Sequence, residues 1–218
     1  MNVISFCVYG ENPIYRLGMI ENLKLIKTVY EHWTPFIYVS STIDVSLAKT
    51  YRELGAQVYQ VKEAETGSFM LYRYLPLAEP NVKRVIFRDA DSRVNEREFK
   101  AVEQWIKEDT ELHIMRDHPR HGVQILGGMW GAKSDRLKNI KQLILKYNHL
   151  KWDYDVDQHM LRQEIYPLLR HSSTVHDEFF DKKPFPTKRE NKEYVGCQFD
   201  EHNNLIHPEL SEMLINHI

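Results

Sequence analysis

The sequence predicts one α/β domain in which a mostly parallel sheet carries helices on both faces. Two observations lead to this prediction. Short apolar runs, rich in β-branched and aromatic residues, indicate buried strands, and between them apolar residues recur every three or four positions, as in helices. Strands that alternate with helices of this length are typical of parallel sheets covered on both sides. With 218 residues, 42% of them hydrophobic, the chain is long enough to bury the core of such a sheet.

In the first part of the chain, four predicted strands alternate with predicted helices. The strands cover residues 3–8, 36–39, 57–61 and 84–87. The first helix follows the apolar series from Leu17 to Trp33, and Pro35 stops it. Asp44 can cap a second helix over residues 45–54, which Gly55 can close. A short helix at residues 68–77 and an amphipathic helix at residues 96–107 complete this series.

The second part of the chain continues the alternation and ends in an irregular tail. We expect a strand at residues 112–115, a glycine-rich turn at 127–131, helices at 134–147 and 157–169, and a last strand at 173–175. The tail over residues 180–204 is polar and aromatic, and a final helix is expected near residues 209–215. No internal repeat or low-complexity segment interrupts the pattern, so one domain accounts for it.

Composition excludes several classes of partner and location. The formal net charge is -2 at pH 7, so no broad basic field attracts nucleic acid or an anionic membrane, and we expect no nucleic-acid partner. Cys7 and Cys197 lie far apart, which is typical of reduced core thiols rather than of a disulfide framework. The N-terminus lacks the pattern of a signal peptide, and no run of 18 apolar residues predicts a membrane span. The expected location is the cytoplasm.

The segment VIFRDADSRV places Asp89 and Asp91 directly after the apolar strand at residues 84–87. In α/β sheets, ligands bind beyond the carboxyl ends of the strands, where this pair is expected. Residues two apart in an extended chain point to the same side, so the two carboxylates can converge, and they repel unless a cation lies between them. Mg²⁺ and Mn²⁺ prefer such oxygen ligands. Arg88 and Arg93 beside them can bind phosphate or offset the acids, and a plain turn with surface ion pairs is the alternative.

The order of motifs around this pair resembles GT-A-fold glycosyltransferases of the bacterial-capsule and large-DNA-virus capsid-glycan type. FRDADSR is followed by HIMRDHPRH, ILGGMWG, a helix headed by DQ, HDEFF and YVGCQFDE. The likeness covers most of the chain, and its most specific block is residues 87–131. It implies a single Rossmann-like GT-A domain over residues 1–218, in which residues 1–95 bind the nucleotide sugar and end in the D-x-D motif. Residues 96–218 would form the acceptor side and the tail.

The resemblance also implies a reaction and its cofactors. The chain would move a sugar from a nucleotide-sugar donor, with a UDP-sugar favoured, to a glycan or another hydroxyl acceptor, and it would use Mn²⁺ or Mg²⁺. Asp89 and Asp91 match the D-x-D motif and would bind the metal and the donor diphosphate, with Asp91 the more direct ligand. Tyr9, Gly10 and Tyr15 lie where such enzymes seat the nucleotide base, on which a tyrosine can stack. A tyrosine at the edge of the core is the alternative.

Four further positions are candidates on the donor side. Arg73 precedes the D-x-D strand and can reach ribose or phosphate, or else form an ion pair on a helix surface. His176 follows the last strand, where many GT-A enzymes place a third metal ligand, although a lone histidine is usually structural. Lys188 and Arg189 lie in a polar loop between prolines and can close over the diphosphate, unless they form a solvated charge cluster.

The acceptor side is predicted at the glycine-rich segment ILGGMWG. There, open backbone at Gly128 beside Met129 and Trp130 suits a sugar ring, and a packed turn is the alternative. An inverting transferase needs a base for the acceptor hydroxyl. Asp157 is the first candidate and Asp117 the second, while a role for Asp157 in the first turn of its helix is the alternative. The sequence does not distinguish inversion from retention at the anomeric carbon.

Other functions compete with this interpretation. His118 and His121 have an H-x-x-H spacing that suggests a zinc hydrolase, but Pro119 interrupts it and no HExxH helix supports it. A phosphatase would carry its paired aspartates on the first strand. A sugar nucleotidyltransferase would carry a glycine- and lysine-rich loop there, which GENPIYRLG lacks. A non-catalytic glycan-binding module has no need of an intact aspartate pair. A chain this short can be a small enzyme or one domain of a longer transferase.

Overall fold

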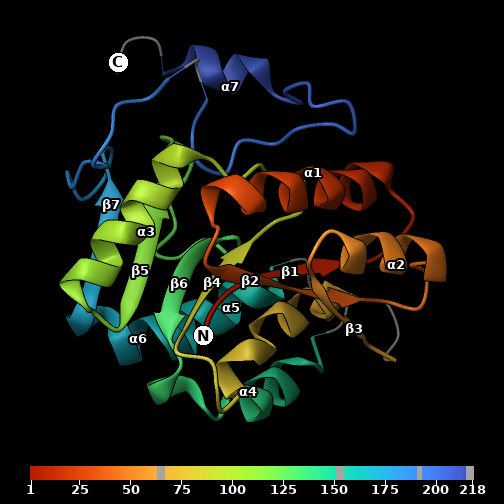
Figure 1. The fold of residues 1–218 in the computed structure, drawn as a ribbon. Helices are drawn as coiled ribbons and strands as arrows, with labels where there is room; N and C mark the ends of the chain where they lie inside the picture. Colours follow the sequence, from red (N-terminus) through yellow and green to blue (C-terminus); the bar gives the residue numbers. More distant parts are fainter. Residues whose placement is uncertain (63–66, 151–154, 191–192, 215–218) are drawn as a thin grey trace.

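The computed structural model describes residues 1–62, 67–150, 155–190 and 193–214. Its centre is a seven-stranded sheet with the strand order β3-β2-β1-β4-β6-β5-β7 (Figure 1). The strands are β1 (Asn2–Val8), β2 (Trp33–Val39), β3 (Gln57–Gln60), β4 (Arg84–Arg88), β5 (Leu112–Arg116), β6 (Met129–Lys133) and β7 (Ser173–Asp177). All adjacent pairs are parallel except the two that involve β6, which runs against β4 and β5. The mostly parallel sheet expected from the sequence is therefore confirmed.

The antiparallel strand β6 corrects one expectation, because residues 129–131 were predicted to lie in a turn. Glycine ordinarily weakens a strand, which is why the run of glycines indicated a turn. Here Gly131 allows close contact between strands: a Cβ atom on it would lie 2.9 Å from both the carbonyl oxygen of Val85 and Cγ2 of Ile86. The missing side chain lets β6 pack directly on β4.

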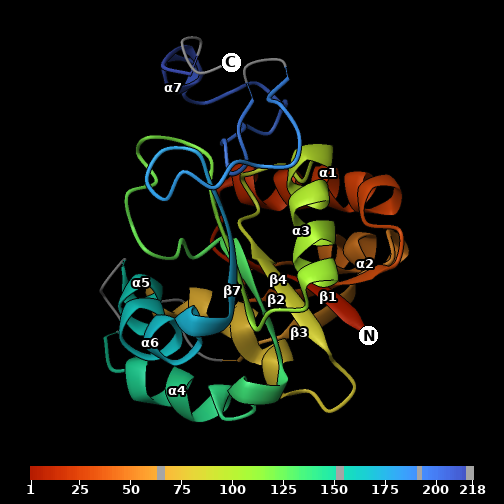
Figure 2. The ribbon, with the colours of Figure 1, turned by 90° about the vertical axis from the view of Figure 1, so that its left-hand side faces the viewer.

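Helices cover both faces of the sheet, as Figures 1 and 2 show. On one face lie α1 (Pro13–Val29), α2 (Val45–Glu53) and α3 (Glu96–Glu108). On the other lie the 3₁₀ segment η1 (Gly67–Ala78), α4 (Ile140–Tyr147), α5 (Val156–Met160) and α6 (Tyr166–Leu169). Alternation along β4 feeds both layers, because Ile86 packs under the first group of helices while Val85 and Phe87 pack under the second.

Short segments complete the helical structure. They are η2 (Asp135–Leu137), the π-helical turn η3 (Leu161–Ile165), η4 (Arg170–Ser172) and α7 (Pro208–Glu212). Side chains cap three of the longer helices: Asn12 accepts from the backbone N–H of Ile14, Asp44 from Leu47, and Asn95 from Glu98. The cap predicted at Asp44 is thus present.

Several predicted boundaries are wrong. The first helix ends at Val29 rather than at Trp33, which begins β2, and Pro35 lies inside that strand. The single helix expected over 157–169 is instead α5, η3 and α6 in succession. The final helix, α7, is shorter than expected, and residues 215–218 lie outside the described part of the chain. None of the described helices is both long enough and apolar enough to cross a membrane.

Two buried imidazoles join β5 to β7. Nε2 of His113 and Nδ1 of His176 lie 2.9 Å apart, and the ring of His113 stacks on Trp105 of α3 at 5.4 Å between ring centroids. Burial lowers the pKa of His176 to about 4 and holds the pKa of His113 well below its ordinary value, and the neighbouring imidazole adds to the effect on His113. Both rings therefore stay neutral in the folded protein at neutral pH.

This pair predicts a loss of stability in acid. Between about pH 6.5 and pH 4 the unfolded chain binds protons at both histidines while the folded chain does not, so stability falls as the pH falls, by about 1.4 kcal/mol per pH unit for each imidazole. His113→Phe keeps a flat ring against Trp105 but removes one of the two titrating groups. The slope of unfolding free energy against pH should therefore decrease by the amount that corresponds to one proton, about 1.4 kcal/mol per pH unit. Urea unfolding at several pH values measures both slopes, and parallel profiles would contradict the prediction.

Candidate active site

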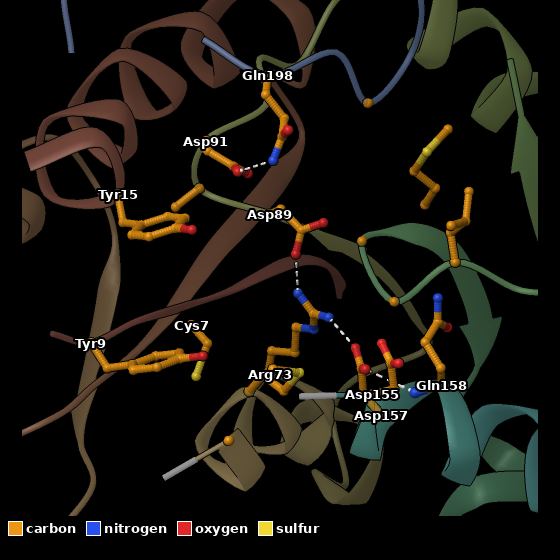
Figure 3. Close-up of a pocket in the computed structure, with 18 of the residues that line it drawn as sticks. Cys7, Tyr9, Tyr15, Arg73, Asp89, Asp91, Asp155, Asp157, Gln158 and Gln198 are labelled. Atoms are coloured by element: carbon orange, nitrogen blue, oxygen red, sulfur yellow. Dashed lines mark hydrogen bonds and ion pairs between the residues drawn. The ribbon is translucent and has the colours of Figure 1, made fainter. Parts of the chain in front are cut away.

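A cavity of about 570 Å³ opens at the edge of the sheet where β1 and β4 end and β6 begins (Figure 3). Its volume lies in the range of small-molecule sites, about 300–1,000 Å³. Five parts of the chain contribute its polar and aromatic walls, which include Cys7, Tyr9, Tyr15, Arg73, Asp89, Asp91, Asp155, Asp157, Gln158 and Gln198. The position agrees with the rule that α/β sheets bind ligands beyond the carboxyl ends of their strands.

The aspartate pair lies on this cavity as the sequence predicts, but its two members have different surroundings. The side chain of Asp89 is 49% exposed, whereas Asp91 is buried. Oδ2 of Asp91 accepts a hydrogen bond of 2.6 Å from Nε2 of Gln198, and its carbonyl oxygen accepts one of 2.8 Å from Phe199. Burial, followed by the charge of Asp89, raises the pKa of Asp91 to about 6. The pair is therefore a place where a cation is electrostatically favoured.

Arg73 links this pair to the other side of the cavity. Its guanidinium forms an ion pair with Asp89 through Nη1 and another with Asp157 through Nη2, the latter at 2.6 Å (Figure 3). Burial raises the pKa of Asp157, while the Arg73 guanidinium opposes that rise and the charge of Asp89 adds to it. The hydroxyl of Tyr74 also donates to Asp157, at 3.4 Å. The three charged side chains thus form one bridge across the cavity, buried at Arg73 and Asp157 and half-exposed at Asp89.

Two glycines make room for this bridge. A Cβ atom on Gly127 would lie 2.1 Å from Oδ2 of Asp157 and 2.5 Å from Nη2 of Arg73. A Cβ atom on Gly128 would lie 1.9 Å from Oδ2 of Asp89. Neither glycine has a positive φ angle, so the space beside the charged groups, and not backbone conformation, requires glycine here. Gly128 and Met129 both line the cavity.

Aromatic side chains form the opposite end of the cavity. Tyr9 follows β1 and Tyr15 lies in the first turn of α1, and both rings border the cavity in Figure 3. Tyr9 also contacts Phe69 with ring centroids 5.1 Å apart, which fixes its orientation. Gly10 is not part of the cavity wall; its φ angle of +74° lets the chain turn from β1 toward α1.

Two predicted ligand contacts point into the core instead. Trp130, expected to face an acceptor sugar, is wholly buried and packs on Phe87 at 4.4 Å and on Tyr74 at 5.3 Å between ring centroids. Arg88, expected near phosphate, is buried under α3 and forms an ion pair of 2.9 Å with Glu98. Strand alternation explains both placements, because neighbouring residues of a strand point to opposite faces. Asp89 and Met129 line the cavity, so their direct neighbours Arg88 and Trp130 point away from it. The flanking arginine therefore belongs to the scaffold.

The structure does not bring His176 to the aspartates. It lies on β7, separated from β4 by β6 and β5, and its ring contacts His113 rather than a carboxylate. Among the described residues, no group of three or more histidine, cysteine, aspartate or glutamate side chains is placed to hold a metal ion. The two histidines of the H-x-x-H pair bind to nearby backbone instead. Nδ1 of His118 accepts a hydrogen bond from the backbone N–H of Arg120, and Nδ1 of His121 accepts one from the backbone N–H of Asp117.

Asp117 and Arg189 hold the tail to the sheet. Asp117 is completely buried and accepts hydrogen bonds from Arg97 at 2.8 Å, Arg189 at 2.7 Å and the backbone N–H of Val195 at 2.9 Å. This carboxylate is occupied by these contacts and does not border the cavity, so the structure does not bring the second candidate base to the other predicted site residues. Arg189 is buried in the same cluster, and Lys188 lines a separate hollow of about 170 Å³ beside the start of α3. Neither residue borders the large cavity.

Several cavity residues have no counterpart among the predicted sites, and Gln158, Gln198 and Gly196 are examples. Gln158 follows Asp157 in α5. The sequence showed the DQ pair at the head of this helix but indicated no role for the glutamine. Gln198 and Gly196 come from the irregular tail, where a single bridge between Ser92 and Gln198 pairs the tail with the segment after β4. Their proximity to Asp91 depends on this long-range contact, which no local sequence pattern indicates.

The donor atoms on the cavity fit a divalent cation that shares its coordination with a phosphate. Mg²⁺ and Mn²⁺ are commonly held by one or two carboxylates together with substrate oxygens. Asp89 and Asp91 supply the carboxylates, and the charge of Asp89, which after burial adds to the raised pKa of Asp91, is a repulsion that a cation between them would relieve. A complete cage of protein ligands is not required for such a cation, so the described residues are consistent with it.

Comparison with known proteins identifies the fold. No family model matches the chain, and neither does any curated protein at a significant level. Among solved structures, a glycosyltransferase involved in the glycosylation of the major capsid of PBCV-1 aligns with a TM-score of 0.54 and 16% identity over 81% of both chains. The galactosyltransferase LgtC, in complex with donor and acceptor sugar analogs, aligns with a TM-score of 0.53 and 13% identity, over 82% of this chain and 74% of that one.

A third neighbour has a different activity. It is 4-diphosphocytidyl-2C-methyl-D-erythritol synthase from Anaerococcus prevotii, with a TM-score of 0.51 and 11% identity over 86% of this chain and 90% of that one. At these identities the likeness shows the fold, which is the GT-A type of α/β domain expected from the sequence.

The surroundings of Asp91 predict that its charge destabilises the protein. The folded chain binds a proton at Asp91 more readily than the unfolded chain, so stability falls as the pH rises from about 4 to about 6. Asp91→Asn, which can keep a partner for Gln198, should therefore unfold less readily than the parent at pH 7.5 without added metal, by up to about 3 kcal/mol. The difference should vanish below about pH 4. Chemical unfolding at the two pH values measures it, and a less stable variant at pH 7.5 would contradict this explanation.

Proposed function

We propose that this chain is a metal-dependent glycosyltransferase that moves a sugar from a nucleotide-diphosphate sugar, with a UDP-sugar favoured, to a hydroxyl group of a glycan or another acceptor. One observation carries the proposal. A single cavity of suitable volume presents an aromatic end, a carboxylate pair and a polar end, in that order. These three surfaces match the base, the diphosphate with its cation, and the sugar of such a donor. The GT-A fold supports the proposal.

The residues of the cavity divide the work in this proposal. Tyr9 and Tyr15 stack on or flank the base, an interaction worth about 1–3 kcal/mol for a base on an aromatic ring. Asp89 and Asp91 hold Mn²⁺ or Mg²⁺ against the diphosphate, and Gln198 orients Asp91 through its 2.6 Å hydrogen bond. When bound, the cation would supply Lewis-acid stabilisation of the departing diphosphate.

The polar end of the cavity would receive the sugar and the acceptor. Asp157 lies there beside Gln158, and Gly128 and Met129 form the adjacent wall. In an inverting reaction the Asp157 carboxylate would accept the proton of the acceptor hydroxyl, and burial favours this because it raises the pKa of the group. In a retaining reaction the same carboxylate would hold sugar hydroxyls.

The remaining parts of the proposal concern organisation and location. Residues 1–95 supply the base and diphosphate contacts of the cavity, and residues 96–218 supply Gly128, Met129, Asp157 and Gln198. In this proposal residues 1–95 form the donor half, and residues 96–218 form the acceptor half and add Gln198 beside Asp91. We further propose that the reaction takes place in the cytoplasm, or in the host cytoplasm if the chain is viral, and that no nucleic acid takes part.

A sugar nucleotidyltransferase is the second candidate. The fold shared with the erythritol synthase favours it, because that alignment covers most of both chains. Against it, the segment between β1 and α1 contains one glycine, Gly10, and no lysine for phosphate. The products distinguish the two functions: a glycosyltransferase releases a nucleoside diphosphate from the sugar nucleotide, whereas a nucleotidyltransferase releases pyrophosphate from a nucleoside triphosphate.

The central test is stabilisation by donor and cation together. UDP, GDP and dTDP sugars, each with Mn²⁺, should be screened by thermal unfolding, and at least one should raise the unfolding temperature, because a ligand that binds only the folded state at 100 times its Kd stabilises it by about 2.7 kcal/mol. Asp91→Asn should abolish this increase. If no nucleotide sugar stabilises the parent protein with Mn²⁺ present, or if Asp91→Asn transfers sugar at the parental rate, the proposal is wrong.

A substitution at Gly128 provides a second test, because it displaces the Asp89 carboxylate by steric contact without changing any charged residue. In Gly128→Ala the new methyl group occupies the position of the Asp89 carboxylate and displaces it, so the stabilisation by UDP-sugar and Mn²⁺ should be lost. The protein without ligand should change by less than about 1 kcal/mol, since only the end of a half-exposed side chain moves. Gly122→Ala is the matched control, because its methyl group would meet only Phe180, at 3.6 Å. Equal loss in both variants would contradict the contact.

A further inference from the structure

Arg73 connects two carboxylates of unequal exposure. The side chain of Asp157 is 7% exposed and that of Asp89 is 49% exposed, while Arg73 itself is 6% exposed. A buried carboxylate has a strong need for its counterion, whereas a half-exposed one is already solvated by water. The bond between Arg73 and Asp89 is therefore the one that can be exchanged.

The guanidinium is anchored so that such an exchange requires little movement. The backbone of Arg73 is fixed to β1, because the hydroxyl of Ser5 donates to its carbonyl oxygen at 2.6 Å. Nη2 is fixed to Asp157, and Nε has no hydrogen-bond partner among the described residues. Only the Nη1 group, which contacts Asp89, faces a partner that solvent also reaches. Release of Asp89 would thus leave the rest of the arginine in place.

We propose that Arg73 is the internal counterion of Asp89, and that a divalent cation binds by displacing it from this carboxylate. The inference rests on the proposed function. Arg73 and the cation carry charges of the same sign and would share the Asp89 carboxylate, so they would compete, and the protein should bind the cation alone weakly. Nη1, released from Asp89 but still held beside it through Asp157, then donates to an anionic oxygen of the donor diphosphate.

Cooperative binding of cation and nucleotide follows from this exchange. The nucleotide gives the displaced Nη1 a new acceptor, so it lowers the free energy that displacement requires. The cation in turn frees the donor that the nucleotide uses. Because coupling between two ligands is reciprocal, each should raise the affinity of the protein for the other. Arg73 is in this sense a binding residue whose partner changes from Asp89 to the donor diphosphate when the site fills.

Two variants test the competition without changing the charge of the site. Arg73→Gln combined with Asp157→Asn removes one positive and one negative group together, which avoids an unpaired buried charge. Arg73→Lys keeps the positive charge but has one ammonium group in place of the two-pronged guanidinium, and the buried Asp157 should retain it. Asp157→Asn alone is the opposite control, because it leaves Arg73 with Asp89 as its remaining carboxylate partner.

Binding of Mn²⁺ to the protein is measured through the electron paramagnetic resonance signal of unbound Mn²⁺. The titration is done first without nucleotide and then with UDP. In the parent protein UDP should increase the affinity for Mn²⁺ by about fivefold or more. In the double variant and in Arg73→Lys, Mn²⁺ alone should bind more tightly than in the parent, and the increase due to UDP should shrink by a similar factor. In Asp157→Asn, Mn²⁺ alone should bind more weakly. Thermal unfolding confirms that each variant is folded.

The outcomes separate the inference from the proposed function. If either folded variant that frees Asp89 binds Mn²⁺ no more tightly than the parent, and the effect of UDP is intact, Arg73 does not compete with the cation and the inference is overturned. If instead the parent and Asp91→Asn bind Mn²⁺ equally, in the presence or absence of UDP, then the aspartates do not form the cation site. That second result refutes the proposed function itself.

Discussion

The contact between β4 and β6 at Gly131 is the constraint on which the rest of the structure depends. The strands β1 to β4 form one parallel group, β5 and β7 form another, and β6 joins them by running antiparallel between β4 and β5. The close approach at Gly131 sets the register in which Met129 pairs with Arg88. This register brings the segment before β6 against the segment after β4, so Gly128 touches Asp89. A single antiparallel strand thus places the second half of the chain over the carboxyl edge of the first.

Charge at this edge is divided into two sets that do different things. One set is closed: Asp117, with Arg97 and Arg189, is buried, saturated and holds the tail on the sheet. The other set is open: Asp89 and Asp91 face a cavity, Asp89 shares Arg73 with Asp157, and the charge of Arg93 offsets that of Asp91 only in part. Paired, buried ions give little net stability but fix geometry, whereas two adjacent carboxylates at a cavity attract a cation. The difference between the sets separates scaffold from site.

Local patterns predicted every strand except β6, and the place of the aspartate pair, because each depends on the residues next to it, whereas Tyr9 and Tyr15 were assigned from the resemblance to GT-A enzymes. Local patterns failed where the partner is distant in sequence. His176 is a chemically plausible metal ligand and Asp117 a plausible base, and only the placement of His113, Arg97 and Arg189 shows that both are occupied. Trp130 was assigned to the cavity because the glycines around it indicated a turn, whereas a strand puts every second side chain into the core. Gln198 lies in the motif YVGCQFDE, but nothing in that motif indicates its role, which arises from a contact with Asp91 across 107 positions.

That last contact also has a consequence for the order in which the protein matures. The wall beside Asp91 is completed by Gly196 and Gln198, and the backbone of Phe199 donates to Asp91 as well. A chain emerging from the ribosome can form β1 to β4 early, since folding during synthesis proceeds from the N-terminus. It cannot enclose the aspartate pair until the tail has been translated and has reached back to the sheet. The two carboxylates are therefore among the first groups of the cavity to be made and among the last to be held in place.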